Sequence, residues 1–148
     1  MRQIYLISGK AESGKNEVAD IMAREYISKG YKCLIIAYGD DLKHIAKTYF
    51  GCDSNKDEYG RKLLKYIGTD LVRDKLKKPD YWVNRVMDIV QMVEQSYDYI
   101  FIPDCRVPNE IEIPYNHYKD LCTSVRINRK NHRSKLTPAQ LSHISETA

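Results

Sequence analysis

The sequence feature that most constrains the fold is a glycine-containing stretch directly after an apolar run near the N-terminus. The run QIYLIS, residues 3–8, predicts a buried strand. It is followed by Gly9, four further residues and the pair Gly14-Lys15, which is the spacing of a phosphate-binding loop. In such loops the backbone amides surround a phosphate, and the positive end of the next helix points at it. We therefore expect a strand, a tight loop and a helix over about 14–29.

The last position of this loop pattern differs from the usual one. A Ser or Thr usually follows the Lys and holds Mg²⁺ through its hydroxyl, whereas this chain has Asn16. An amide oxygen can still bind Mg²⁺ or a water of its hydration shell. We therefore expect phosphate binding, while direct coordination of Mg²⁺ by Asn16 stays open. The candidate nucleotide-binding residues are Gly9, Ala11, Ser13, Gly14, Lys15, Asn16 and Glu17.

Strands and helices alternate along the rest of the chain. Apolar runs predict further strands over 32–38, 97–104 and 121–127. Apolar residues at helical spacing predict helices over about 41–50, 59–77 and 81–96, and a short helix after Pro108. This order favours an α/β fold in which helices cover both faces of a parallel sheet. Ligands of such sheets bind at the carboxyl ends of the strands.

The stretch PDCRVPNE, residues 103–110, lies at one of these strand ends. Asp104 ends the third predicted strand, where a carboxylate can hold Mg²⁺ through water beside a phosphate loop. Arg106, two residues further on, could reach a phosphate. The alternative interpretation is a simple turn in which Asp104 caps the helix after Pro108.

The predicted helix 59–77 carries two stripes of residues. The stripe that we expect to be buried consists of Leu63, Leu64, Ile67 and Leu71. Beside it, at intervals of four, lie Arg61, Lys65, Thr69 and Arg73. Like charges at this spacing repel each other, so a bound anion would relieve them. A solvated basic face is an equally good interpretation.

A second basic group, RINRKNHR at 126–133, follows the last predicted strand. Its arginines could close on a phosphoryl group during transfer, although a flexible basic loop explains the same residues.

The net charge of +4 suits a protein that handles small anions and does not favour nucleic acid. No apolar run approaches the length of a membrane span. Four widely spaced cysteines without a CxxC pair favour reduced thiols in a cytosolic protein over disulfides or a zinc site.

Taken in order, these stretches resemble the deoxynucleoside monophosphate kinases of the phage type, over nearly the whole chain. SGKAESGKNEVAD is similar to that family's phosphate loop and first helix, where an acidic or amide residue often replaces Ser or Thr. DLKHIA is similar to the segment after its second strand, and GRKLLKYIGTDLVRD with PDYWVNRV to its substrate-side helices. PDCRVPNE resembles its strand-end Asp-x-Arg motif, and HISETA its C-terminal His-x-Ser-Glu stretch.

The resemblance implies a single P-loop NTPase-type kinase domain over residues 1–148, with a short lid around 129–140. It implies phosphorylation of a deoxynucleoside monophosphate to the diphosphate, with ATP as donor and Mg²⁺ as cofactor. The expected location is the cytoplasm, or the host cytoplasm if the chain is phage-encoded. No nucleic-acid or membrane partner is implied, and a homodimer is left open.

Positions that match the family's motifs carry its residue roles over to this chain. The implied residues of the reaction centre are Lys15, Asp104 and Arg106, and Arg129 of the basic group 126–133 is a further catalytic candidate. The implied residues on the monophosphate side are Arg61, Lys65, Thr69, Asp70 and Arg73. Lys43 and Trp82 are further substrate-binding candidates. Trp82 could stack on a base together with Tyr81, although both are equally good core residues. Mg²⁺ is expected at Asn16 and Asp104. Lys65 stands where the family more usually has Gln, so the contacts at that position are open.

Two other functions are compatible with the same motifs. Phosphomevalonate kinases of the animal type share the loop style and the strand-end Asp-x-Arg. A nucleotide-dependent switch or binding module without turnover would also use the loop, and Asn16 leaves that class open. A turnover assay with ATP separates both from the favoured reaction.

Overall fold

The computed structural model of the chain describes residues 1–10, 14–51 and 58–128. Contacts divide the chain into two compact units. We call Met1–Ala37 with Val90–Ala148 the sheet unit, and Tyr38–Ile89 the helical unit.

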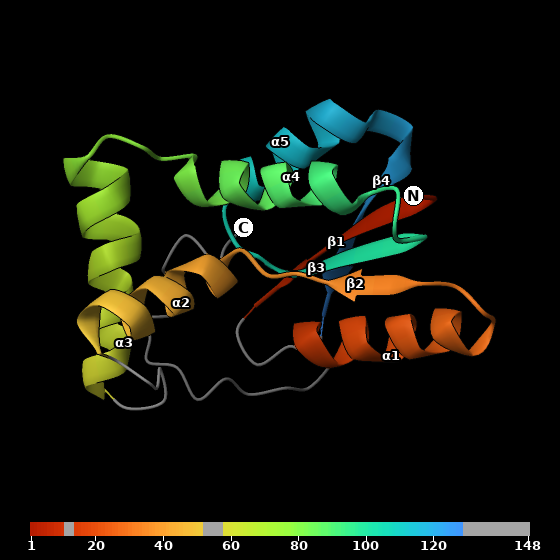
Figure 1. Cartoon of the computed structure of the whole chain (residues 1–148), viewed down its shortest axis with the longest axis horizontal. Coiled ribbons are helices and arrows are strands. Elements are labelled where there is room, and N and C mark those ends of the chain that lie inside the picture. Colours follow the sequence, from red (N-terminus) through yellow and green to blue (C-terminus); the bar gives the residue numbers. More distant parts are fainter. Residues whose placement is uncertain (11–13, 52–57, 129–148) are drawn as a thin grey trace. The chain divides into compact units, whose positions relative to one another are not determined.

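The sheet unit contains four parallel strands in the order β2-β3-β1-β4 (Figure 1). The strands are β1 (Gln3–Gly9), β2 (Cys33–Ile35), β3 (Tyr99–Cys105) and β4 (Cys122–Ile127). The prediction of an α/β fold with a parallel sheet is thereby confirmed. β2 is shorter than the predicted strand 32–38.

Helices cover both faces of this sheet. α1 (Lys15–Ser28) lies on one side and α5 (Asn109–Tyr118) on the other, followed by a 3₁₀ turn at Lys119–Leu121 (Figure 1). Successive side chains of a strand point to opposite faces. In β1 the neighbours Leu6 and Ile7 are both fully buried, which requires cover on each face.

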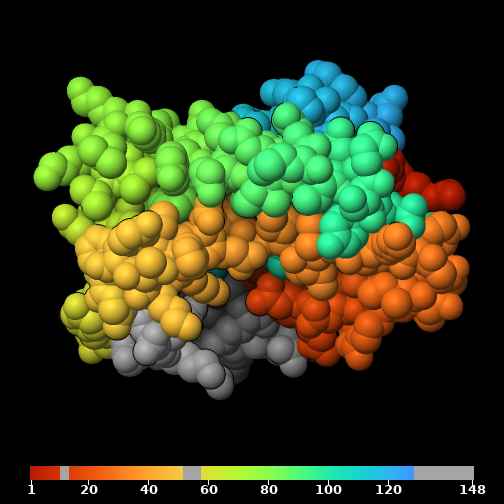
Figure 2. Space-filling model, viewed as in Figure 1, coloured from red at the N-terminus to blue at the C-terminus, as the bar shows by residue number. Residues whose placement is uncertain are grey.

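Small side chains let α1 pack closely on the sheet. Ala19 and Ala23, one turn apart, are buried against Ile7 and Phe101. The opposite side of α1 is open to solvent (Figure 2, orange-red), and Ile21 is 53% exposed there.

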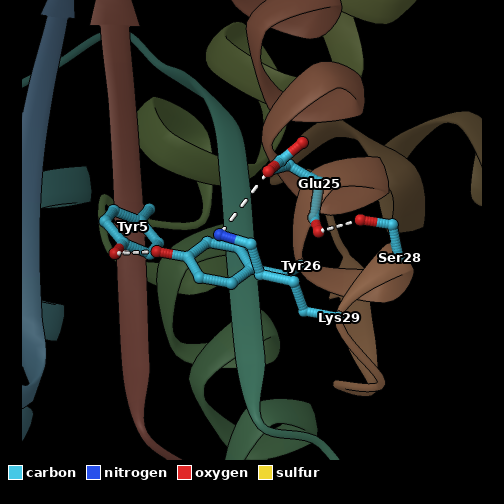
Figure 3. A network of polar contacts seen from close by, with 5 residues as sticks. All are labelled: Tyr5, Glu25, Tyr26, Ser28 and Lys29. Atoms are coloured by element: carbon cyan, nitrogen blue, oxygen red, sulfur yellow. Dashed lines mark hydrogen bonds and ion pairs between the residues drawn. The ribbon is translucent and has the colours of Figure 1, made fainter.

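A tyrosine pair joins the end of α1 to β1. The hydroxyl groups of Tyr5 and Tyr26 lie 2.9 Å apart, and the Tyr26 ring stacks on Tyr99 with ring centroids 3.8 Å apart. Figure 3 shows this pair next to the last turn of α1, where the Ser28 hydroxyl donates to the Glu25 carbonyl. Burial, then the hydrogen bond to Tyr26, raises the pKa of Tyr5 to about 12.

The helical unit contains α2 (Gly39–Phe50), α3 (Glu58–Lys65), the π-helix η1 (Tyr66–Lys75) and the start of α4 (Tyr81–Val93). The prediction of one α-helix over 59–77 is wrong in its second half, because the chain changes there to i→i+5 hydrogen bonds. The amide of Leu76, for example, donates to the Leu71 carbonyl at 2.9 Å.

The π-helix changes which residues of this segment are buried. Ile67 and Val72, five residues apart, are buried, whereas the predicted Leu71 is only half-buried. An i→i+5 repeat brings residue i+5, rather than i+4, back to the same side. Ala46 of α2 and Trp82 of α4 complete this core. No helix in the described part of the chain is long and apolar enough to cross a membrane.

Candidate functional site

The glycine loop follows β1 and ends at α1, as the sequence predicts. Gly14 is the N-cap of α1 with φ 94°, a left-handed conformation that a side chain disfavours. A Cβ at Gly14 would meet none of the described residues within 4 Å, and it is the positive φ that favours glycine here. The Lys15 ammonium donates to the Gly9 carbonyl oxygen at 2.9 Å. Lys15 therefore reaches across the loop from its last residue to its first.

The end of β3 lies beside the start of this loop. Cys105 is the register partner of Ser8, the residue before Gly9, so Asp104 also belongs to this edge of the sheet. Asp104 is half-buried. Burial, then the carboxylates of Asp104 and Glu110, raises the pKa of the Cys105 thiol, and Lys15 lowers it. The thiol thus stays neutral among charged groups from the loop, β3 and α5.

Strand β4 adds a cation to the same edge. Arg126 is the register partner of Ser8 and is exposed at the carboxyl end of β4. Only the pairing of β4 with β1 brings it there. The sequence signal was its place in the basic group at 126–133, although Arg126 was not among the predicted site residues. Ala11, Ser13, Arg129 and the predicted lid at 129–140 lie outside the described residues.

Glu110 is a residue of this region that sequence reasoning missed. It lies in the first turn of α5, only 3% exposed, and its Oε1 accepts from the backbone amides of Arg106 and Val107 at 2.8 and 2.9 Å. An acidic residue in the first turn after a strand-end motif is a helix-start signal. That signal could have indicated Glu110 as the residue that shapes the turn carrying Arg106.

Asn16 and Asp104 fit Mg²⁺ by the chemistry of their donor atoms. Both offer oxygen ligands, which Mg²⁺ prefers, and Asn16 is exposed in the first turn of α1. Among the described residues no group of three or more His, Cys, Asp or Glu could hold a metal ion. Mg²⁺ that arrives with ATP needs few protein ligands, because phosphate and water oxygens fill most of its positions.

The predicted monophosphate residues lie in the helical unit, and their environments differ. Lys43 on α2, Arg61 and Lys65 on α3, and Asp70 on η1 are exposed, whereas Thr69 and Arg73 on η1 are half-buried. The Arg73 Nε is buried without a hydrogen-bond partner among the residues that the structure describes. Arg73 is therefore the member of this set with an unmet need for an acceptor.

Trp82 belongs to the core of the helical unit. It is 3% exposed, and its indole N–H donates to the Gly68 carbonyl oxygen at 3.1 Å. Its stacking on a base stays a prediction. On the exposed side of α4, Tyr81, Asn84 and Asp88 line a pocket of about 320 Å³ together with Lys78, Pro79, Asp80 and Arg85. Arg85 pairs there with Asp41 at 2.7 Å.

Comparison with known proteins adds no relative to this description. No family model matches the sequence, and no curated protein matches it. The chain is thus defined by its own features: an α/β fold with a four-stranded parallel sheet, and a glycine loop at the carboxyl end of β1.

Proposed function

We propose that the chain is an ATP-dependent kinase that phosphorylates a deoxynucleoside monophosphate. The observation that carries the proposal is the Lys15–Gly9 contact across a GxxxxGK loop, at a sheet edge that also holds Asp104 and Arg126. An ammonium, an arginine and a carboxylate around a loop of this spacing suit a nucleoside triphosphate.

Lys15 is the residue to which we assign the donor phosphates. In the free protein its ammonium is held by a neutral carbonyl oxygen. A phosphate oxygen is the stronger acceptor, because both partners are then charged. A phosphate of bound ATP would therefore compete with the Gly9 carbonyl oxygen for the Lys15 ammonium. The same ammonium then neutralises charge on the phosphoryl group during transfer.

Asp104 and Asn16 are assigned to Mg²⁺. The ion, when bound, would neutralise charge on the β- and γ-phosphates and orient them. Asp104 would act through the ion's water shell, since a half-buried carboxylate at a strand end can accept from such waters. Asn16, exposed beside Lys15, offers a neutral amide oxygen.

The acceptor monophosphate is assigned to the basic residues of α3 and η1. Arg73 supports this assignment most directly, because its buried Nε has no acceptor among the described residues. A phosphate dianion would supply one and would also relieve the repulsion between Arg61 and Lys65, which lie four apart on α3. Phosphoryl transfer itself then needs little beyond positioning and charge neutralisation.

The deciding experiment is ADP release by the purified chain with ATP and Mg²⁺. Each of the four common deoxynucleoside monophosphates, and phosphomevalonate, is offered in turn. We expect release with a monophosphate, and a fall of about 100-fold or more in Lys15→Ala. Lys29→Ala, at the exposed far end of α1, is the matched control and should keep full activity. Release with phosphomevalonate alone, or with no acceptor at all, would reject the proposal.

A further inference from the structure

Glu110 is a buried carboxylate for which the proposed reaction has assigned no part. Burying a charged carboxylate is costly unless hydrogen bonds compensate it. Here Oε1 accepts from two consecutive amides, those of Arg106 and Val107, at 2.8 and 2.9 Å. These hydrogen bonds link the first turn of α5 to the residues that follow β3, so they restrain the backbone of the turn between the two elements.

The turn that Glu110 holds begins with Arg106 and follows Asp104 of β3, so it adjoins two of the candidate functional residues. Asp104 and Arg106 flank Cys105, the last residue of β3. The Arg106 side chain is exposed, whereas its backbone amide is fixed by Glu110. Fixing that amide limits the directions in which the guanidinium can extend. Cys105 is the register partner of Ser8, the residue before the glycine loop, so the turn that begins at Arg106 starts at the same edge of the sheet as the loop.

We propose that Glu110 is a positioning residue, which acts through Arg106 to hold its guanidinium toward a phosphate of ATP bound at the glycine loop. This inference rests on the proposed function for its ligand. Glu110 itself touches no substrate. One oxygen of its carboxylate accepts from two amides, which offsets part of the cost of burying its negative charge.

A purely structural Glu110 and a positioning Glu110 predict different couplings to Arg106. If Glu110 only stabilises α5, its loss lowers stability, and any effect on nucleotide binding adds to that of removing Arg106. If it works through Arg106, its loss matters only while Arg106 is present. A double-mutant cycle separates the two, because residues that act as one unit are not additive.

The test uses the full chain with Glu110→Leu, Arg106→Ala and the double variant. ATP affinity is measured by calorimetry and turnover by ADP release, at a temperature where near-ultraviolet circular dichroism shows each variant folded. We expect Glu110→Leu to lower turnover by about 100-fold, as expected for a misplaced positioning group. The double variant should fall no more than about twofold below Arg106→Ala.

Two further variants define the chemistry. Glu110→Gln keeps an oxygen that can accept from both amides and should stay close to the wild type. Glu112→Leu, on the exposed side of the same first turn of α5, is the matched control and should also keep its activity. If Glu110→Leu does not fold, the same cycle is run with Glu110→Asp, whose shorter side chain cannot reach both amides without moving the turn.

The outcomes separate this inference from the proposed function. If the fold-losses of the two single variants multiply in the double variant, the positioning role of Glu110 is rejected and the proposed function is unaffected. The same holds if a folded Glu110→Leu keeps wild-type affinity and turnover. Binding of ATP without transfer to any monophosphate overturns the proposed function, and the cycle on ATP affinity still decides the role of Glu110. A wild-type chain that binds no ATP overturns both.

Discussion

The indole N–H of Trp82 donates to the carbonyl oxygen of Gly68 at 3.1 Å, which joins the first turn of α4 to the π-helix η1. Gly68 is buried and closely surrounded, because a Cβ added to it would lie 3.1 Å from Leu42 Cδ2. Trp82 therefore stabilises the π-helix η1, both by this hydrogen bond and by packing against it.

Trp82→Phe should destabilise the protein. The substitution removes the donor to Gly68 and leaves a gap in the core formed with Ile67 and Val72. We expect the free energy of unfolding to fall by at least about 2 kcal/mol, from the lost hydrogen bond and the gap together. Urea denaturation monitored by far-ultraviolet circular dichroism measures it. Tyr81→Phe, next in the chain and half-buried, should change little, and equal losses in both variants would contradict this explanation.

Lys77→Gly should stabilise the protein. Lys77 follows the end of η1 with φ 54°, a left-handed conformation that costs about 1 kcal/mol for a residue with a side chain. Glycine adopts it freely, so we expect a gain of about 0.5–1 kcal/mol, seen as a higher melting temperature. Lys75→Gly, at the last residue of η1, is the control and should lower the melting temperature instead. A lower melting temperature for Lys77→Gly would show that the left-handed residue is not strained.

Arg73→Met should separate stability from substrate binding. The variant keeps an unbranched apolar stem and removes the buried Nε that has no partner among the described residues. An unsatisfied buried donor costs about 1–3 kcal/mol, so the free protein should become more stable by up to that amount. The Michaelis constant for the monophosphate should rise, and that for ATP should not. Arg61→Met, at an exposed position, should leave stability unchanged. A less stable Arg73→Met would show that the guanidinium is satisfied in solution.

Asp104 and Asn16 should differ sharply in importance. Asn16→Ser restores the hydroxyl that usually follows the loop lysine, so activity should be kept or increased. Asp104→Asn removes the charge expected to act on Mg²⁺ and should be far more harmful. Rates measured over a range of Mg²⁺ concentrations test both variants. A severe loss in Asn16→Ser with full activity in Asp104→Asn would reverse the assignment.

The tyrosine pair predicts how stability changes at high pH. The pKa of Tyr5 is raised in the folded chain to about 12, from about 10 in an unfolded chain. The unfolded state therefore releases its proton first as pH rises. The stability that Tyr5 contributes is complete below pH 10 and is lost between about pH 10 and 12. Unfolding free energies over this range should decline less steeply in Tyr5→Phe. An unchanged slope would show that Tyr5 titrates alike in both states.

Local sequence determined much of this protein. The run at residues 3–8 forms β1 because β-branched and aromatic residues favour a strand that is covered on both faces. The backbone at position 14 has a positive φ, which glycine adopts without strain, and α1 begins at the next residue, Lys15. These features depend on neighbours in the chain, so the parallel α/β arrangement and the loop could be predicted from residue types and spacing alone.

The tertiary structure decided the features that depend on distant residues. Arg126 reaches Ser8 only through the pairing of β4 with β1, and the Glu110 carboxylate reaches two amides only after the turn beyond β3 has formed. Leu71 fits the buried stripe of a regular α-helix, yet Val72 is the residue that is buried. The segment forms a π-helix, in which Val72 packs with Ile67 and Trp82 and the Gly68 carbonyl accepts from the Trp82 indole. A period read from the sequence assumes a regular helix, whereas the register that forms depends on which packing and hydrogen bonds give the lower free energy for the folded chain as a whole.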